Sequence, residues 1–125
     1  MARKKSPTLT EAELRVMEVL WGDAPATVAE VVESLSRKSP VAYSTVLTTM
    51  RILERKGYLT HKKEGRAFLY SPLVNRGEAR SNVLRYMLSK FFNNSPELLM
   101  LNILKEEKID TRELQRLKKR IKESE

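Results

Sequence analysis

Hydroxyl and guanidinium side chains recur at helical spacing in the segment that begins near residue 43. They are Ser44, Thr48, Arg51 and Arg55 on one line, with Thr45 and Thr49 beside it. On a helix, this spacing places them along one face. Short hydroxyl side chains can hydrogen-bond base edges or phosphates at close approach, and arginines bind phosphates or guanine. The chemistry available to this face is therefore recognition of nucleic acid.

A helix must carry this face and turn it outward. The spacing predicts a helix from residue 43 or 44 to Lys56, with Gly57 as its C-cap. Its opposite side is apolar and is expected to face the core, through Val46, Met50 and Leu53. The alternative for hydroxyls at a helix start is that they serve only as caps. We expect this of one of the first two hydroxyl residues, whereas Thr48 and Thr49 lie too far into the helix.

A β-hairpin is predicted directly after this helix. Residues 58–63 and 66–71 have the character of strands and flank Glu64-Gly65 as a two-residue loop. This pairing gives the hairpin an apolar base and a cationic tip. At the tip we expect Lys63 and Arg66 to contact phosphates beside the groove that the helix enters.

His61 is the only histidine of the chain. The predicted pairing puts it opposite Phe68, with Leu59 opposite Tyr70 on the same face, so we expect a packed or half-exposed strand residue. One histidine without any cysteine cannot form a first-row metal site. No nucleophile lies beside a base either, so we expect no metal, no cofactor and no enzymatic activity.

Two further helices are predicted before this region, each starting with a capping box, Thr10-Glu11-Ala12-Glu13 and Thr27-Val28-Ala29-Glu30. Apolar residues recur along both and are expected to face the core: Leu14, Met17, Leu20 and Trp21, then Val28, Val31, Val32 and Leu35. The order helix, helix, turn, helix, hairpin is that of a winged helix-turn-helix. In this motif the second helix meets base edges in the major groove.

Positive charge is concentrated where nucleic acid would bind. The chain of 125 residues has a formal net charge of +8, which suggests a polyanionic partner. Residues 6–41 carry 3 basic and 6 acidic residues, residues 42–70 carry 6 and 2, and Arg3-Lys4-Lys5 adds another cluster. A solvated basic helix beside an unrelated hairpin is the alternative. The acidic first two helices, the basic third helix and the basic hairpin tip together make it less favourable.

The remainder, residues 74–125, is predicted to be helical and to form a dimer. Helices are expected at about 75–92, at about 96–105 and from Asp110 onward. Their apolar side chains could form an internal core, but they exceed what one thin helical layer can bury, so we expect a second copy to cover them. The candidate dimer contacts are Leu84, Leu88, Phe91, Leu98, Leu101, Leu104, Leu114 and Leu117. The fold class is thus mostly α with a small β-hairpin wing. A winged helix-turn-helix DNA-binding domain is expected at residues 1–73, and a helical dimerisation domain at residues 74–125.

Composition also indicates where the chain acts. The absence of cysteine excludes disulfides and fits a reducing cytosol. No apolar run is long enough to span a bilayer, and the charged first five residues lack the apolar stretch of a signal peptide. We therefore expect a cytoplasmic protein without direct membrane insertion.

Three motifs resemble the penicillinase-repressor family of the BlaI, MecI and copper-responsive CopY type. The opening helix of that family resembles Leu9-Thr10-Glu11-Ala12-Glu13-Leu14, followed by Val16-Met17 and Leu20-Trp21. Its recognition helix resembles Tyr43-Ser44-Thr45-Val46-Leu47-Thr48, with Leu53 and Lys56-Gly57. Its wing resembles Glu64-Gly65-Arg66-Ala67-Phe68-Leu69-Tyr70-Ser71-Pro72. The resemblance is strong over about residues 8–73 and extends to the rest in pattern only.

This resemblance implies a dimeric winged-helix repressor that binds palindromic operators, often with TACA and TGTA half-sites. It assigns base reading to Ser44, Thr45 and Thr48, and family members often have a basic residue where this chain has Ile52. In the β-lactam branch, a membrane sensor-protease system triggers cleavage between an Asn and a Phe. Asn102-Ile103 resembles that site with Ile in place of Phe, and the alternative is ordinary dimer-helix sequence. Copper sensing through a C-terminal cysteine cluster is excluded, because the chain has no cysteine.

The sequence therefore predicts a sequence-specific transcriptional repressor that occupies a palindromic operator as a homodimer and is relieved by C-terminal cleavage or loss of the dimer. The alternatives are a winged-helix module that binds proteins and a non-specific DNA-binding protein. A small ligand between the C-terminal helices is a third, although no polar cluster there suggests one. Steep salt dependence combined with sequence preference would distinguish the repressor from the first two.

Overall fold

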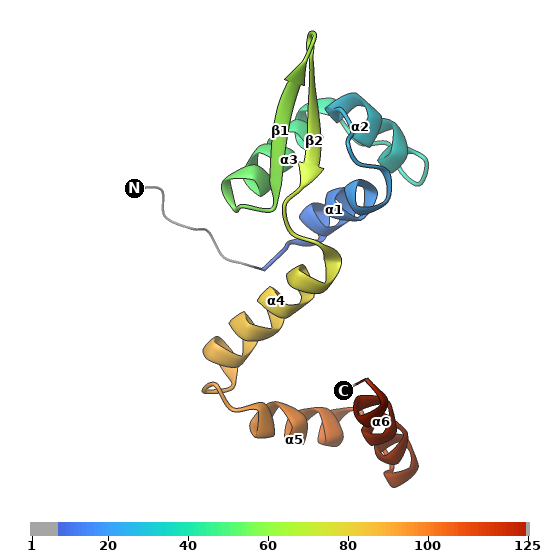
Figure 1. Cartoon of the computed structure of the whole chain (residues 1–125), viewed down its shortest axis with the longest axis vertical. Coiled ribbons are helices and arrows are strands. Elements are labelled where there is room, and N and C mark those ends of the chain that lie inside the picture. Colours follow the sequence, from blue (N-terminus) through green and yellow to red (C-terminus); the bar gives the residue numbers. More distant parts are fainter. Residues whose placement is uncertain (1–7, 125) are drawn as a thin grey trace. The chain divides into compact units, whose positions relative to one another are not determined.

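The computed structural model describes residues 8–124, and the basic cluster Arg3-Lys4-Lys5 lies outside this range. The described elements are α1 (Glu11–Asp23), α2 (Val28–Ser36), α3 (Tyr43–Arg55), β1 (Leu59–Glu64), β2 (Ala67–Pro72), α4 (Arg76–Phe91), α5 (Pro96–Glu106) and α6 (Thr111–Glu123) (Figure 1). The chain divides after Tyr86 into two compact units, and α4 begins in the first and ends in the second.

The first unit is built from α1 to α3 and the hairpin around one apolar core. Both predicted capping boxes are present: the hydroxyls of Thr10 and Thr27 accept hydrogen bonds from the backbone N–H groups of Glu13 and Glu30. The core contains the predicted stripe of α3 together with residues of the other elements: Val16, Met17, Leu20, Val31, Val46, Met50, Leu53, Tyr58, Leu59 and Tyr70.

One core prediction for α1 is wrong. Leu14 is 40% exposed, and Glu13 is buried in its place at 5%. The buried side of the helix therefore follows the spacing of residues 13, 16, 17 and 20, and a carboxylate occupies its first position. Leu14 instead lines a shallow apolar groove with Trp21, Ala79 and Val83, where α1 meets the first half of α4.

The predicted register of the hairpin is also wrong, by two residues. The loop is Gly65-Arg66 rather than Glu64-Gly65, and the observed pairs include Leu59 with Pro72, His61 with Tyr70 and Lys63 with Phe68. Gly65 has φ +64°, and a glycine at the first loop position is typical of a type II′ turn. Because side chains alternate along a strand, a shift of two leaves each one on its predicted face.

The base of the wing is joined to the rest of the first unit at Tyr70. Its backbone N–H donates to the Ala26 carbonyl at 2.8 Å, and the Ala26 N–H donates back to Tyr70 at 3.1 Å. This antiparallel bridge extends the hairpin across the segment before α2. The buried Tyr70 ring and this bridge fix the register from the base of the wing.

The helices of the second unit begin and end close to their predicted bounds. Asn93 and Asn94 have positive φ values after α4, Ser95 caps α5, and Asp110 caps α6. Neither α5 nor α6 has a buried residue within the described chain.

Among residues 8–124, no helix combines the length and apolar character that crossing a membrane requires.

Candidate nucleic-acid interface

The outer face of α3 presents the side chains that the spacing predicted. Ser44, Thr45, Thr48, Arg51 and Arg55 are exposed, and Thr49 is partly buried. The N-cap of α3 is Ala42, which makes no side-chain capping bond. The expectation that Ser44 or Thr45 serves as the cap is therefore wrong, and both lie within the helix. The Thr49 hydroxyl donates to the Thr45 carbonyl at 2.9 Å, so only its acceptor lone pairs remain for a ligand.

Two shallow grooves follow this face. One is lined by Thr48, Arg51, Glu54 and Arg55 on α3 alone. The other lies between α3 and the wing, and Arg51 and Glu54 line it together with His61 and Arg66. Arginines in both grooves are suited to bind phosphate groups, because each guanidinium presents several donors in a plane.

The cationic wing tip is present, with its residues placed differently from the prediction. Arg66 occupies the second loop position, while Lys63 lies in β1 opposite Phe68. Both side chains belong to exposed residues. The hairpin thus carries cations beside the face of α3, as phosphate contacts next to an occupied groove require.

Glu54 is a residue of this interface that the sequence reasoning missed. Its carboxylate lies 2.8 Å from Nδ1 of His61. The centroid of the imidazole ring also lies 5.1 Å from that of Phe68 and 5.2 Å from that of Tyr70. His61 is thus a half-exposed strand residue, within the prediction of a packed or half-exposed one, but it also faces a carboxylate. Burial raises the pKa of the Tyr70 phenol, and the nearby Glu54 charge raises it further.

Lys56 belongs to the basic segment but does not face solvent. Its Nζ donates to Glu13 Oε1 at 2.7 Å and to the Thr8 carbonyl at 2.9 Å. The two side chains are 10% and 7% exposed. This ion pair joins the end of α3 to the start of α1, so Lys56 orients the helix rather than adding to its cationic face.

The candidate dimer contacts lie on α4, α5 and α6. Five are exposed and three are half-buried: Leu84, Phe91, Leu98, Leu101 and Leu117, then Leu88, Leu104 and Leu114. Asn102 is exposed on α5 and donates from Nδ2 to the Leu98 carbonyl at 2.9 Å, while Ile103 is half-buried.

Within the described part of the chain, no three His, Asp or Glu side chains are grouped so that they could hold a metal ion.

Comparisons with known proteins match nearly the whole chain. The penicillinase repressor family model covers residues 9–123. The penicillinase repressor of Bacillus licheniformis is 32% identical over 91% of this chain and 89% of its own length. The methicillin resistance regulatory protein MecI of Staphylococcus aureus is 23% identical over 91% of this chain and 93% of its own length.

Two solved structures match the N-terminal part. The DNA-binding domain of the repressor BlaI is 38% identical with a TM-score of 0.54, over 61% of this chain and 93% of that one. The monomeric form of Bacillus licheniformis BlaI in complex with the blaP half-operator gives 38% and 0.51 over the same shares. The winged helix-turn-helix and the resemblance noted from the motifs are both confirmed. The chain belongs to the penicillinase repressor family.

Proposed function

We propose that this chain represses transcription by binding a palindromic operator as a homodimer, with α3 in the major groove and the wing on the adjacent backbone. The observation that carries the proposal is the outward face of α3, where hydroxyls precede arginines and wing cations lie alongside. Membership in a family of repressors, not enzymes, supports it. So does the half-operator complex of a relative that shares this domain.

The proposed contacts differ in what they recognise. Ser44, Thr45 and Thr48 read base edges near the start of α3, where a recognition helix approaches the bases. Phosphates are contacted by the remaining residues: Thr49, Arg51 and Arg55 on α3, and Lys63 and Arg66 on the wing. Ile52 is half-buried and carries no charge, so we assign the phosphate contacts along this part of α3 to the neighbouring arginines.

A second copy of the chain is the proposed cover for the apolar side chains of α4 to α6. Phe91 and Leu101 are 74% and 61% exposed in the single chain, although both are large and apolar. Burying them against an identical chain also supplies the second DNA-binding domain that a palindrome needs. In this proposal residues 1–73 bind DNA and residues 74–125 dimerise.

Relief of repression is proposed to follow cleavage between Asn102 and Ile103, or another loss of the dimer, in the cytoplasm. A membrane sensor-protease system is the proposed trigger, by analogy with the β-lactam branch. The bond lies inside α5, and proteases bind extended backbone, so α5 must unwind locally before it is cut.

Selection of bound DNA from a random pool, at near-physiological salt, tests the proposal. The full chain is compared with Thr45→Ala/Thr48→Ala, and Thr111→Ala on α6 serves as an exposed control. We expect the full chain and the control to select a two-fold-symmetric site that the double variant fails to select. Binding without a selected motif would favour a non-specific DNA-binding protein. A folded dimer that retains no DNA would favour a protein-binding module.

A further inference from the structure

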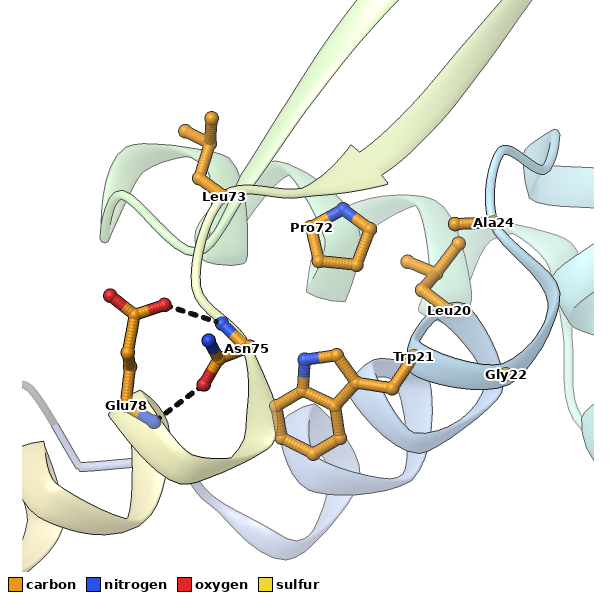
Figure 2. Close-up of a pocket in the computed structure, with 8 residues that line it drawn as sticks. All are labelled: Leu20, Trp21, Gly22, Ala24, Pro72, Leu73, Asn75 and Glu78. Atoms are coloured by element: carbon orange, nitrogen blue, oxygen red, sulfur yellow. Dashed lines mark hydrogen bonds between the residues drawn. The ribbon is translucent and has the colours of Figure 1, made fainter.

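Trp21 near the end of α1 holds the segment that connects the wing to α4. Its Nε1 donates to the Val74 carbonyl at 2.8 Å, and the Arg76 guanidinium lies 5.1 Å from the centroid of its ring. Figure 2 shows the indole between α1 and this segment, beside the first turn of α4, where Asn75 and Glu78 are joined by two hydrogen bonds. One side chain therefore contacts the chain on both sides of the point where α4 starts.

The start of α4 is held within the first unit at further points. Asn75 and Glu78 form a reciprocal cap, with N–H to oxygen distances of 3.0 and 2.8 Å, which fixes where the helix begins. One turn later, Ala79 is 4% exposed and belongs to the apolar core. A hydrogen bond, a cation–π contact and a buried alanine together set the direction in which α4 leaves α1 to α3.

The direction of α4 matters because this helix runs on past Tyr86 toward the residues proposed for the dimer. In the proposed dimer, each α3 is connected to the dimer contacts through the start of α4, so the contacts that hold this start bear on the separation and rotation of the two α3 helices. The spacing of the two half-sites on the DNA must match this separation and rotation. We propose that Trp21 is a positioning residue that, by anchoring the start of α4, determines which half-site spacing the operator must have.

The inference rests on the proposed dimeric operator binding and yields a magnitude. In this proposal, binding to a wrongly spaced site requires the start of α4 to lose its contacts with Trp21 on at least one protomer. Removing the Nε1–H donor lowers the free-energy cost of that step by about one net hydrogen bond. This corresponds to about fivefold tighter binding of a wrongly spaced site for each protomer that moves. Contacts from α3 and the wing to a single half-site do not involve the start of α4.

The test measures affinity for the selected operator, for the same half-sites moved apart or together by one to five base pairs, and for one isolated half-site. Full-length wild type is compared with Trp21→Phe, which keeps the apolar ring, and with Arg76→Gln, which removes the cation. Arg85→Gln is the matched control, because Arg85 lies on the same helix and bonds to Asn82. Thermal unfolding is followed for all four proteins.

We expect Trp21→Phe to bind wrongly spaced operators about fivefold better relative to the selected one, with half-site affinity unchanged. Arg76→Gln should show a change of about two- to fivefold in the same direction, because it removes an exposed cation–π contact. Arg85→Gln should keep the wild-type profile. The inference is overturned if both variants keep that profile, or if they weaken every site equally, as a general loss of folding would. Arg76→Gln decides the matter if Trp21→Phe does not fold, and it retains the single tryptophan of the chain as a fluorescent reporter. If wild type selects no palindrome at all, the proposed function itself fails, which is a separate result.

Discussion

Replacing Lys56 by methionine should destabilise the first unit by breaking the buried ion pair between α3 and α1. Methionine keeps most of the length and apolar character of the lysine stem, so the substitution mainly removes the ammonium group. Two hydrogen bonds disappear with it, one to Glu13 Oε1 and one to the Thr8 carbonyl. Glu13 remains as a carboxylate whose side chain is 7% exposed.

The size of the effect follows from what Glu13 retains. Removing one partner of a buried ion pair typically costs about 3–5 kcal/mol, because an uncompensated charge is left behind. Glu13 Oε1 still accepts the Thr10 N–H at 2.9 Å, so we expect the lower end, about 3 kcal/mol. In the double variant Lys56→Met/Glu13→Gln the amide leaves no buried charge. It should be more stable than Lys56→Met by about 1–2 kcal/mol.

Urea unfolding followed by circular dichroism measures these differences at one fixed protein concentration, because a dimer makes stability depend on concentration. Arg55→Met is the control, since Arg55 lies one residue away and is exposed. A Lys56→Met midpoint within experimental error of wild type would refute the reasoning. So would a double variant that is less stable than Lys56→Met, because the cost would then not come from an unpaired carboxylate.

Three further predictions concern DNA binding and assembly. Glu54→Gln should strengthen operator binding by about fivefold at pH 8 in titrations at fixed salt, because a carboxylate beside a phosphate costs about 1 kcal/mol in water. Weaker binding would instead mean that its contact with His61 holds the wing in place. Alanine at all three positions of Arg3-Lys4-Lys5 should reduce the slope of log affinity against log salt by about 0.9 for each phosphate that the protein no longer neutralises, and an unchanged slope would exclude this cluster from the interface. Phe91→Glu should give monomers in sedimentation at concentrations where wild type is a dimer, whereas Lys119→Glu on exposed α6 should not.

Short sequence motifs and periodicity were sufficient to predict features that depend on a single helix. The capping boxes at Thr10 and Thr27 could be read from two residues three positions apart, and both start a helix in the structure. The outward face of α3 followed from spacing alone, since Val46 and Met50 required the opposite side for the core. Helical periodicity therefore predicted most of the candidate interface.

Contacts between elements could not be predicted in this way. The pairs Glu54–His61 and Glu13–Lys56 join residues 7 and 43 positions apart, and no single periodicity relates them. The charge count of residues 42–70 included Lys56, but a count does not say which side of α3 a residue occupies.

The predicted register of the hairpin was wrong for another reason. Glu-Gly and Gly-Arg are both acceptable two-residue loops, and the choice between them was made by the core. Burial of Tyr70 and its bridge to Ala26 fix the pairing from the base of the wing, whereas the sequence reasoning started from the loop.

Because contacts at its base fix the register of the hairpin, they limit how the length of the hairpin can vary among natural or engineered variants. An insertion of one residue in each strand would leave the pairs near Tyr70 unchanged and extend the finger by about 3.4 Å, but it would turn the outermost pair to the opposite face. Two residues in each strand would extend it by about 7 Å and restore the original face. The reach of the wing and the side to which its terminal cation projects are therefore coupled, and only even steps of elongation change one without the other.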